Sequence, residues 1–183
     1  MMIDRERSAL WVIDVQGALL NQEHDWQRML DACIWLVELA KRLGVPVLAS
    51  EQYPKGLGHT HPDLLESMAK EPATVAVGKQ VFSCVAANCF AGVAAAERPQ
   101  VILCGMEAHV CILQTALDLR AQGREVFVVA DAITARDKLD IDLAIERLRA
   151  AGATIVSKEM VGFEWLRAAG SPEFKDFSVN FLQ

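Results

Sequence analysis

The hydrophobic residues of this chain fall into short, unbroken runs, and each run is followed by turn residues and then by a stretch of helical periodicity. Six runs have the length and the β-branched content of strands. Because they are apolar at nearly every position rather than at alternate ones, they are typical of strands buried on both faces of a parallel sheet. The predicted strands are 9–14, 45–50, 74–78, 100–105, 125–130 and 154–157.

Between these runs, apolar residues recur every three or four positions, as on one face of an α-helix. The clearest case is 26–43, which is followed by Gly44 and Pro46, two residues that end helices. The segments 108–122 and 138–151 show the same pattern, and each ends before a glycine. Alternating strands and helices predict an α/β fold of three layers, doubly wound around a mostly parallel six-stranded sheet. Since no linker or repeat interrupts the pattern, we expect residues 1–183 to form one domain.

Composition and charge narrow the class of partner. Apolar residues make up 52% of the chain, charged residues 23%, and the net charge is −6. This balance argues against nucleic acid or an anionic membrane, since either partner favours a basic face. No apolar run approaches the roughly 18 residues that span a bilayer, and no signal-like segment opens the chain. We therefore expect a cytoplasmic protein whose partner is a small molecule.

Ligands of doubly wound sheets bind beyond the carboxyl ends of the strands, so the residues that follow the strands are the first candidates. Asp14 ends the first predicted strand, where a carboxylate needs a partner. Lys79 follows the third strand, and CGMEAHVC (104–111) follows the fourth. The alternatives are a turn aspartate and a solvated lysine with no role in chemistry.

The five cysteines show no C-x-x-C spacing, which excludes a zinc ribbon and a thioredoxin-type motif. Cys33 lies on a helical apolar stripe and Cys104 within a strand, so both are predicted to be inert core residues. Cys84 and Cys89 flank a turn and follow no strand directly. Cys111 falls in the first turn of the 108–122 helix, where the helix dipole and free amides lower the pKa of a thiol.

Cys111 is therefore the candidate nucleophile, if the chain has one. Asp14 could take its proton, Lys79 could stabilise the thiolate, and amides at the start of the helix could receive an oxyanion. His109 is the other candidate base, but side chains two residues apart at a helix start diverge, so we expect it to line a pocket or to lie at the surface.

Four segments in order, VIDVQ, GKQVFS, GMEAHVC and DAITAR, resemble the isochorismatase-like (cysteine hydrolase) superfamily, which includes nicotinamidases, N-carbamoylsarcosine amidases and isochorismatases. The similarity spans roughly residues 7–165. It implies a parallel six-stranded α/β sheet and an Asp-Lys-Cys triad of Asp14, Lys79 and Cys111, in which the cysteine attacks a carbonyl, the aspartate is the acid/base and the lysine supports the thiolate. It also implies a non-proline cis peptide bond between Met106 and Glu107, and an oxyanion hole formed by the backbone amides of Glu107 and Cys111.

The sequence departs from the nicotinamidase pattern after the second strand. The Asp-x-His segment that helps to hold a metal in nicotinamidases is replaced by Ser-Glu-Gln-Tyr at 50–53. His59 and His61 follow as loop histidines, which are either solvated or together ligate a metal. We expect no metal and no other cofactor. The segment EQYPKGLG resembles small isochorismatase-domain hydrolases, and the retained Cys111 indicates acyl chemistry on an amide-like substrate, by way of a thioester.

Two alternatives stay open. One is a vinyl-ether hydrolase, as in isochorismatase itself, that does not use Cys111. The other is a non-catalytic, oligomeric binding protein on the same fold, which predicts a thiol pKa near its free value of about 8.5. A dinucleotide-binding Rossmann protein is disfavoured because DVQGALL lacks the G-x-G-x-x-G turn.

Position alone assigns further roles. The predicted walls of the substrate pocket are Gln16, Glu51, Tyr53, Phe82 and His109. Trp11 and Trp35 are predicted core residues. Asp131 lies in the segment 131–136, which is expected to shape the far side of the site, and is itself predicted to be a capping residue. The C-terminal segment 171–183 carries three phenylalanines without an obvious helical stripe. The family resemblance implies a homo-oligomer, a dimer or larger, and this segment could pack either on its own domain or on a neighbouring copy.

Overall fold

The computed structural model describes residues 1–69 and 74–182. Six strands form one sheet in the order β3-β2-β1-β4-β5-β6, and every neighbouring pair is parallel. The strands are β1 (Ser8–Ile13), β2 (Val47–Gln52), β3 (Thr74–Lys79), β4 (Gln100–Met106), β5 (Glu125–Thr134) and β6 (Thr154–Val156). This is the doubly wound sheet that the sequence predicts, with its strand order reversing between β1 and β4.

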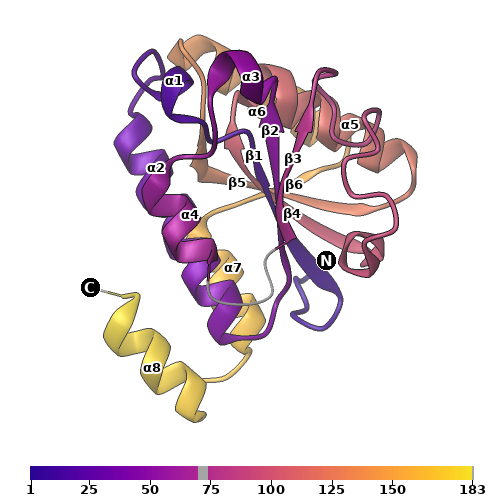
Figure 1. The fold of residues 1–183 in the computed structure, drawn as a ribbon. Helices are drawn as coiled ribbons and strands as arrows, with labels where there is room; N and C mark the ends of the chain where they lie inside the picture. Colours follow the sequence, from indigo (N-terminus) through magenta and orange to yellow (C-terminus); the bar gives the residue numbers. More distant parts are fainter. Residues whose placement is uncertain (70–73, 183) are drawn as a thin grey trace.

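Helices cover both faces of the sheet (Figure 1). One face packs against α2 (Trp26–Arg42), α4 (Pro62–Met68) and α7 (Lys158–Leu166), and the other against α5 (Leu113–Ala121) and α6 (Lys138–Ala150). The short helices α1 (Gly17–Leu20) and α3 (Pro54–Leu57) lie at the carboxyl ends of the strands, and a 3-10 turn, η1 (Ala94–Glu97), precedes β4. No helix among the described residues is long and apolar enough to cross a membrane.

Two hydrophobic cores explain why the strands read as unbroken apolar runs. Side chains alternate between the faces of a strand, and in β1 Leu10 and Val12 enter the core under α2 while Trp11 and Ile13 enter the core under α5 and α6. All six residues of β1 are buried. A strand with a hydrophobic core on each side has no position for a solvated side chain.

Differences from the predicted elements lie mainly at the ends of segments. The predicted 108–122 helix begins with a π-helical turn, η2 (Ala108–Ile112), before α5, and β2 is shifted to 47–52. β5 continues to Thr134 through an irregularity in its pairing with β4. The Asp131 carboxylate accepts a hydrogen bond from the amide of Lys158 (2.8 Å), so its expected capping role is confirmed at the start of α7.

The prediction that the C-terminal segment lacks a helical stripe is wrong. Ser171 caps the helix α8 (Pro172–Asn180), and three phenylalanines spaced by three and four residues lie along one side of it: Phe174, Phe177 and Phe181. Phe177 is fully buried against Trp35 of α2 and Phe163 of α7, with ring centroids 5.8 and 5.3 Å apart. The segment therefore packs on its own chain.

Candidate active site

Asp14, Lys79 and Cys111 meet at the carboxyl edge of the sheet. The Nζ atom of Lys79 lies 2.7 Å from Oδ2 of Asp14 and 3.6 Å from Sγ of Cys111. All three side chains are buried, with at most 5% of each residue exposed. Residues that are 65 and 32 positions apart in the sequence thus form one cluster of carboxylate, ammonium and thiol.

The backbone at the ends of β1 and β4 is closely packed and fixes the position of Asp14. Asp14 has φ of 53°, a left-handed conformation that aspartate tolerates better than most residues, and its amide donates to the carbonyl of Ser50 (3.1 Å). Beside it, Gly105 has φ of 112°, and a Cβ there would lie 2.1 Å from the carbonyl oxygen of Ile13. Only glycine allows β4 to lie this close to the end of β1.

Cys111 lies in the π-helical turn η2, directly after the cis peptide bond between Met106 and Glu107 that the family resemblance implied. The carbonyl of Glu107 accepts hydrogen bonds from the amides of Val110 and Ile112, both at 3.1 Å. These bonds wind the turn so that Cys111 reaches the Lys79 ammonium. Single π-helical turns are frequent at functional sites.

The charges around the sulfur oppose each other. Burial raises the pKa of the Cys111 thiol to about 12, and the negative charge of Asp14 contributes in the same direction while Lys79 opposes it. The predicted lowering of this pKa by the helix start is therefore wrong, because burial and the carboxylate outweigh it. Burial lowers the pKa of Lys79, but the charges of Asp14 and Cys111 more than offset this, so the lysine is a stable cation.

Two further side chains contact the cluster and were missed by the sequence reasoning. The hydroxyl of Ser50 donates to Oδ1 of Asp14 (2.7 Å), and Oε1 of Gln52 accepts from Nζ of Lys79 (2.6 Å). Both residues lie on β2, the strand between β1 and β3. Alternation along a strand sends residues 50 and 52 to one face, and this is the sequence signal that could have found them.

Two predicted pocket residues are engaged within the fold instead. Gln16 is fully buried, and its amide bonds to the backbone of Gln52 and of Gly58. The Glu51 carboxylate accepts from the amide and the hydroxyl of Thr60, at 2.7 and 2.9 Å. The structure thus places both residues as braces of the loop after β2.

The other three predicted pocket residues lie in different surroundings. Tyr53 and Phe82 are about half exposed, at 48% and 47%, and Tyr53 lines a cavity of about 230 Å³ together with Lys79. His109 is directed toward α6, with Nε2 3.7 Å from Oδ2 of Asp140. Its other ring nitrogen is buried, with no hydrogen-bond partner within 1–69 and 74–182.

The histidines after β2 do not fit the metal site of nicotinamidases. His59 contacts Glu51 (3.0 Å), while the ring of His61 accepts from the amide of Asp63 (3.4 Å) at the start of α4. In the part of the chain that the structure describes, no three His, Cys, Asp or Glu side chains are grouped to hold a metal ion.

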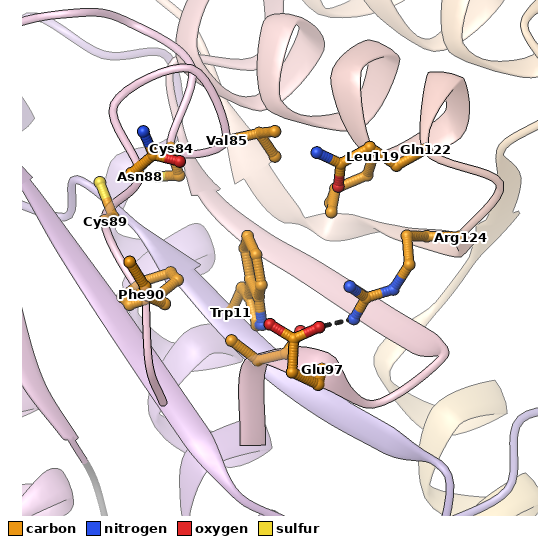
Figure 2. Close-up of a pocket in the computed structure, with 12 residues that line it drawn as sticks. Trp11, Cys84, Val85, Asn88, Cys89, Phe90, Glu97, Leu119, Gln122 and Arg124 are labelled. Atoms are coloured by element: carbon orange, nitrogen blue, oxygen red, sulfur yellow. Dashed lines mark hydrogen bonds between the residues drawn. The ribbon is translucent and has the colours of Figure 1, made fainter. Parts of the chain in front are cut away.

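A second cavity of about 340 Å³ lies on the α5 side of the sheet, and the residues that line it do not include the triad (Figure 2). Trp11, Cys84 and Cys89 line it, and both cysteines are buried. A hydrogen bond between the two thiols raises the pKa of Cys84 and lowers that of Cys89. Arg124 closes one end by donating to the carbonyl of Ala96 (2.6 Å).

A family model described as the isochorismatase domain matches residues 8–160, so this chain belongs to the isochorismatase family of hydrolases. It is 35% identical over 173 residues to the secreted isochorismatase effector Isc1 of Phytophthora sojae, covering 93% of this chain and 82% of the relative. It is 33% identical over 179 residues to the mouse isochorismatase domain-containing protein 2A, covering 93% and 81%. Among solved structures, the MAR1 ribonuclease of Caenorhabditis elegans superposes with a TM-score of 0.89 at 32% identity, over all of this chain and 93% of the other.

More distant structures share the fold alone. The YcaC gene product of Escherichia coli, described as an octameric hydrolase of unknown specificity, superposes with a TM-score of 0.83 at 22% identity, over 99% of this chain and 96% of the other. The nicotinamidase PncA of Bacillus subtilis superposes with a TM-score of 0.68 at 16% identity, over 82% and 99%.

Proposed function

We propose that this chain is a cysteine hydrolase that cleaves a small amide-like substrate through a thioester on Cys111, without a metal. The observation that supports the proposal is the buried contact of Lys79 with both Asp14 (2.7 Å) and the Cys111 sulfur (3.6 Å). A structural ion pair needs no thiol, whereas a thiol nucleophile needs both a base and a cation at this range.

In the first half of the proposed reaction, Asp14 takes the thiol proton as the sulfur attacks the substrate carbonyl. The Asp14 carboxylate and the Cys111 sulfur both contact the Lys79 ammonium, at 2.7 and 3.6 Å, so the thiol proton has a short path to the carboxylate. The Lys79 ammonium stabilises the negative charge on sulfur, and the backbone amides of Glu107 and Cys111 receive the developing oxyanion. Asp14 then protonates the leaving amine, which departs as the C–N bond breaks and the thioester forms.

In the second half, water replaces the amine. Asp14, again a carboxylate, removes a proton from water as the oxygen attacks the thioester carbonyl. The C–S bond breaks, the product acid leaves, and the proton returns to the sulfur. Ser50 holds Asp14 through Oδ1 during both steps, which leaves the carboxylate oriented for proton transfer.

The names of the relatives suggest two substrate classes. The Bacillus neighbour is a nicotinamidase, which supports an amide substrate. The Caenorhabditis relative is called a ribonuclease, so RNA is the second candidate. The net charge of −6 favours the amide, because RNA binding depends on basic groups that neutralise phosphate.

The test measures the activity of the wild type, Cys111→Ala and Cys111→Ser against a panel of substrates. The panel contains small amides, a vinyl ether and an RNA oligonucleotide. We expect amide hydrolysis in the wild type only, with a loss of at least about 10³-fold in both variants, as is typical when a nucleophile is removed. Mass spectrometry should detect an acyl group on Cys111 when a slow amide is used.

Amide turnover at the wild-type rate in Cys111→Ala would contradict the thioester. Turnover of the vinyl ether in all three proteins would favour the alternative in which the thiol has no role.

The octameric YcaC neighbour supports a further proposal, that this chain forms a homo-oligomer. Light scattering on the protein would show or refute it.

A further inference from the structure

We propose that Gln52 is a positioning residue that aims the Lys79 ammonium at the sulfur of Cys111. The inference rests on the proposed function, in which that sulfur is the nucleophile. Gln52 does not contact the thiol itself. It acts through its contact with Lys79, and it extends the three-residue cluster to a fourth side chain.

An ammonium group has three N–H donors and no acceptor, and the cluster offers one acceptor for each donor. Nζ of Lys79 lies 2.7 Å from Oδ2 of Asp14, 2.6 Å from Oε1 of Gln52 and 3.6 Å from Sγ of Cys111. The donors are fixed tetrahedrally, so two short bonds to oxygen also fix the direction of the third. Without Gln52 only one short bond remains, and the ammonium can turn about its terminal bond.

The orientation of the Gln52 amide follows from its other contact. Nε2 of Gln52 donates to the carbonyl of Gln80 (2.8 Å), and a carbonyl can only accept, so the oxygen of the amide must face Lys79. A glutamate of the same shape would present a second carboxylate to the lysine. That charge would offset the positive field at the sulfur, whereas the neutral amide accepts the N–H without cancelling it.

A buried glutamine holds Gln52 in turn. Oε1 of Gln16 accepts from the amide of Gln52 (2.7 Å), while its Nε2 donates to the carbonyls of Gln52 (2.9 Å) and Gly58 (2.7 Å). Gln16 is fully buried, and Gln52 pairs in register with Lys79 across β2 and β3. The position of the amide is thus set by the sheet and by Gln16, which is what a positioning residue requires.

The experiment measures the rate at which iodoacetamide alkylates Cys111 at pH 8, resolved from the other cysteines by peptide mass spectrometry. It compares the wild type with Gln52→Leu, Gln52→Glu and Lys79→Met. The matched control is Gln80→Glu, which adds the same charge on an exposed neighbouring side chain. No substrate is needed, so the readout is separate from turnover.

We expect Lys79→Met to give the slowest alkylation and Gln52→Leu to fall between it and the wild type, at least twofold slower. Gln52→Glu should be at least about threefold slower, because a tenfold smaller thiolate fraction is partly offset by the greater nucleophilicity of a more basic thiolate. Gln80→Glu should stay within twofold of the wild type. Melting curves establish that each variant is folded, and Gln52→Glu, which keeps the shape of the side chain, carries the test if Gln52→Leu does not fold.

Two outcomes overturn the inference in distinguishable ways. If Lys79→Met is slow but both Gln52 variants alkylate within twofold of the wild type, Gln52 is only structural and the proposed function stands. If Lys79→Met alkylates like the wild type, the ammonium does not support the thiolate, and both the inference and that step of the proposed mechanism fail.

Discussion

The thiol of Cys111 is kept protonated by its own surroundings. Burial and the Asp14 carboxylate raise its pKa to about 12, against the opposing charge of Lys79. Under the proposed function, the site would hold Cys111 as a thiol until a carbonyl arrives, when proton transfer to Asp14 and attack by sulfur would occur together. The buried contacts of the cluster also protect the sulfur from adventitious reaction in the absence of substrate.

The sequence could predict the triad because each member follows a strand, or the turn after one, and parallel strands end at the same edge of a sheet. It could not predict Ser50 and Gln52 in the same way. Their strand was predicted to end at 50, which left 51–53 in a loop, whereas β2 continues to Gln52. One or two residues at the end of a strand decide whether a side chain faces the cluster, and strand ends are where periodicity is weakest.

Glu23 gives a prediction at the residue scale that is independent of catalysis. Its side chain is buried, and burial, with the nearby charge of Glu107, raises its pKa from 4.5 to about 7, while Arg136 opposes. Between these two pH values the unfolded chain is ionised and the folded chain is protonated. The unfolded state then binds fewer protons, so the free energy of unfolding falls as the pH rises from about 4.5 to about 7.

The substitution Glu23→Gln removes this dependence, because an amide stays neutral and can still donate to Glu107. The difference between pKa values of 4.5 and about 7 corresponds to about 3 kcal/mol. The free energy of unfolding of the variant should therefore exceed that of the wild type by up to this amount at pH 8, and by less at pH 5. Urea unfolding at both pH values measures it, with the exposed Glu66→Gln as control. An advantage that is equal at pH 5 and pH 8 would contradict the argument.

At the scale of elements, the strands were predictable and the turn that holds Cys111 was not. Strands with a core on each face have few polar positions, and this pattern survives in the sequence. A π-helical turn has the same apolar residues as an α-helix and differs only in which amide bonds to which carbonyl. The segment 108–122 therefore reads as one helix, although η2 and α5 are distinct.

The helix α8 was missed for a different reason. Its stripe consists of Phe174, Phe177 and Phe181 alone, and it becomes meaningful only against the partners that it covers on α2 and α7. Most of the stability of a short helix comes from such packing rather than from its own propensity.

Gly105 is a position on β4 where the addition of one methyl group should strongly lower the free energy of unfolding. The Cβ of Gly105→Ala would lie 2.1 Å from the carbonyl oxygen of Ile13, where β4 runs beside the end of β1. Backbone must move to relieve that contact, so we expect a loss of about 3 kcal/mol or more in the free energy of unfolding. We also expect slower alkylation of Cys111, since β1 carries Asp14 and β4 leads to η2.

Gly123→Ala is the matched control for this substitution. Gly123 also has a positive φ, of 79°, but nothing lies within 4 Å of a Cβ built there. Gly123→Ala should lower the free energy of unfolding by only about 1–2 kcal/mol, the cost of a residue with a side chain in the left-handed conformation. Equal losses in the two variants, measured by urea unfolding, would show that backbone conformation rather than the contact with Ile13 sets the cost.

At the scale of the whole molecule, the strand order decides where chemistry can occur. The chain places β1 first and then winds outward to β2 and β3 before returning to β4 on the other side. The crevice at the reversal lies between β1 and β4, and Asp14 and Cys111 come from its two sides. Lys79 must reach in from the edge strand across β2, which is why two β2 side chains contact the triad.

The same order predicts a gradient of stability across the sheet, which hydrogen exchange can measure. β1 and β4 have a strand on each side and a core on each face, so we expect their amides to exchange only on global unfolding. β6 has three residues, pairs only with β5 among the residues that the structure describes, and exposes Thr154, so its amides should exchange orders of magnitude faster through local opening. Peptides covering 8–13, 100–106 and 152–157 separate the cases by mass. Exchange in β6 as slow as in β1 would contradict this gradient for an isolated chain. Repeating the exchange at a dilution where the protein has the mass of one chain would then show whether a second copy covers the β6 edge.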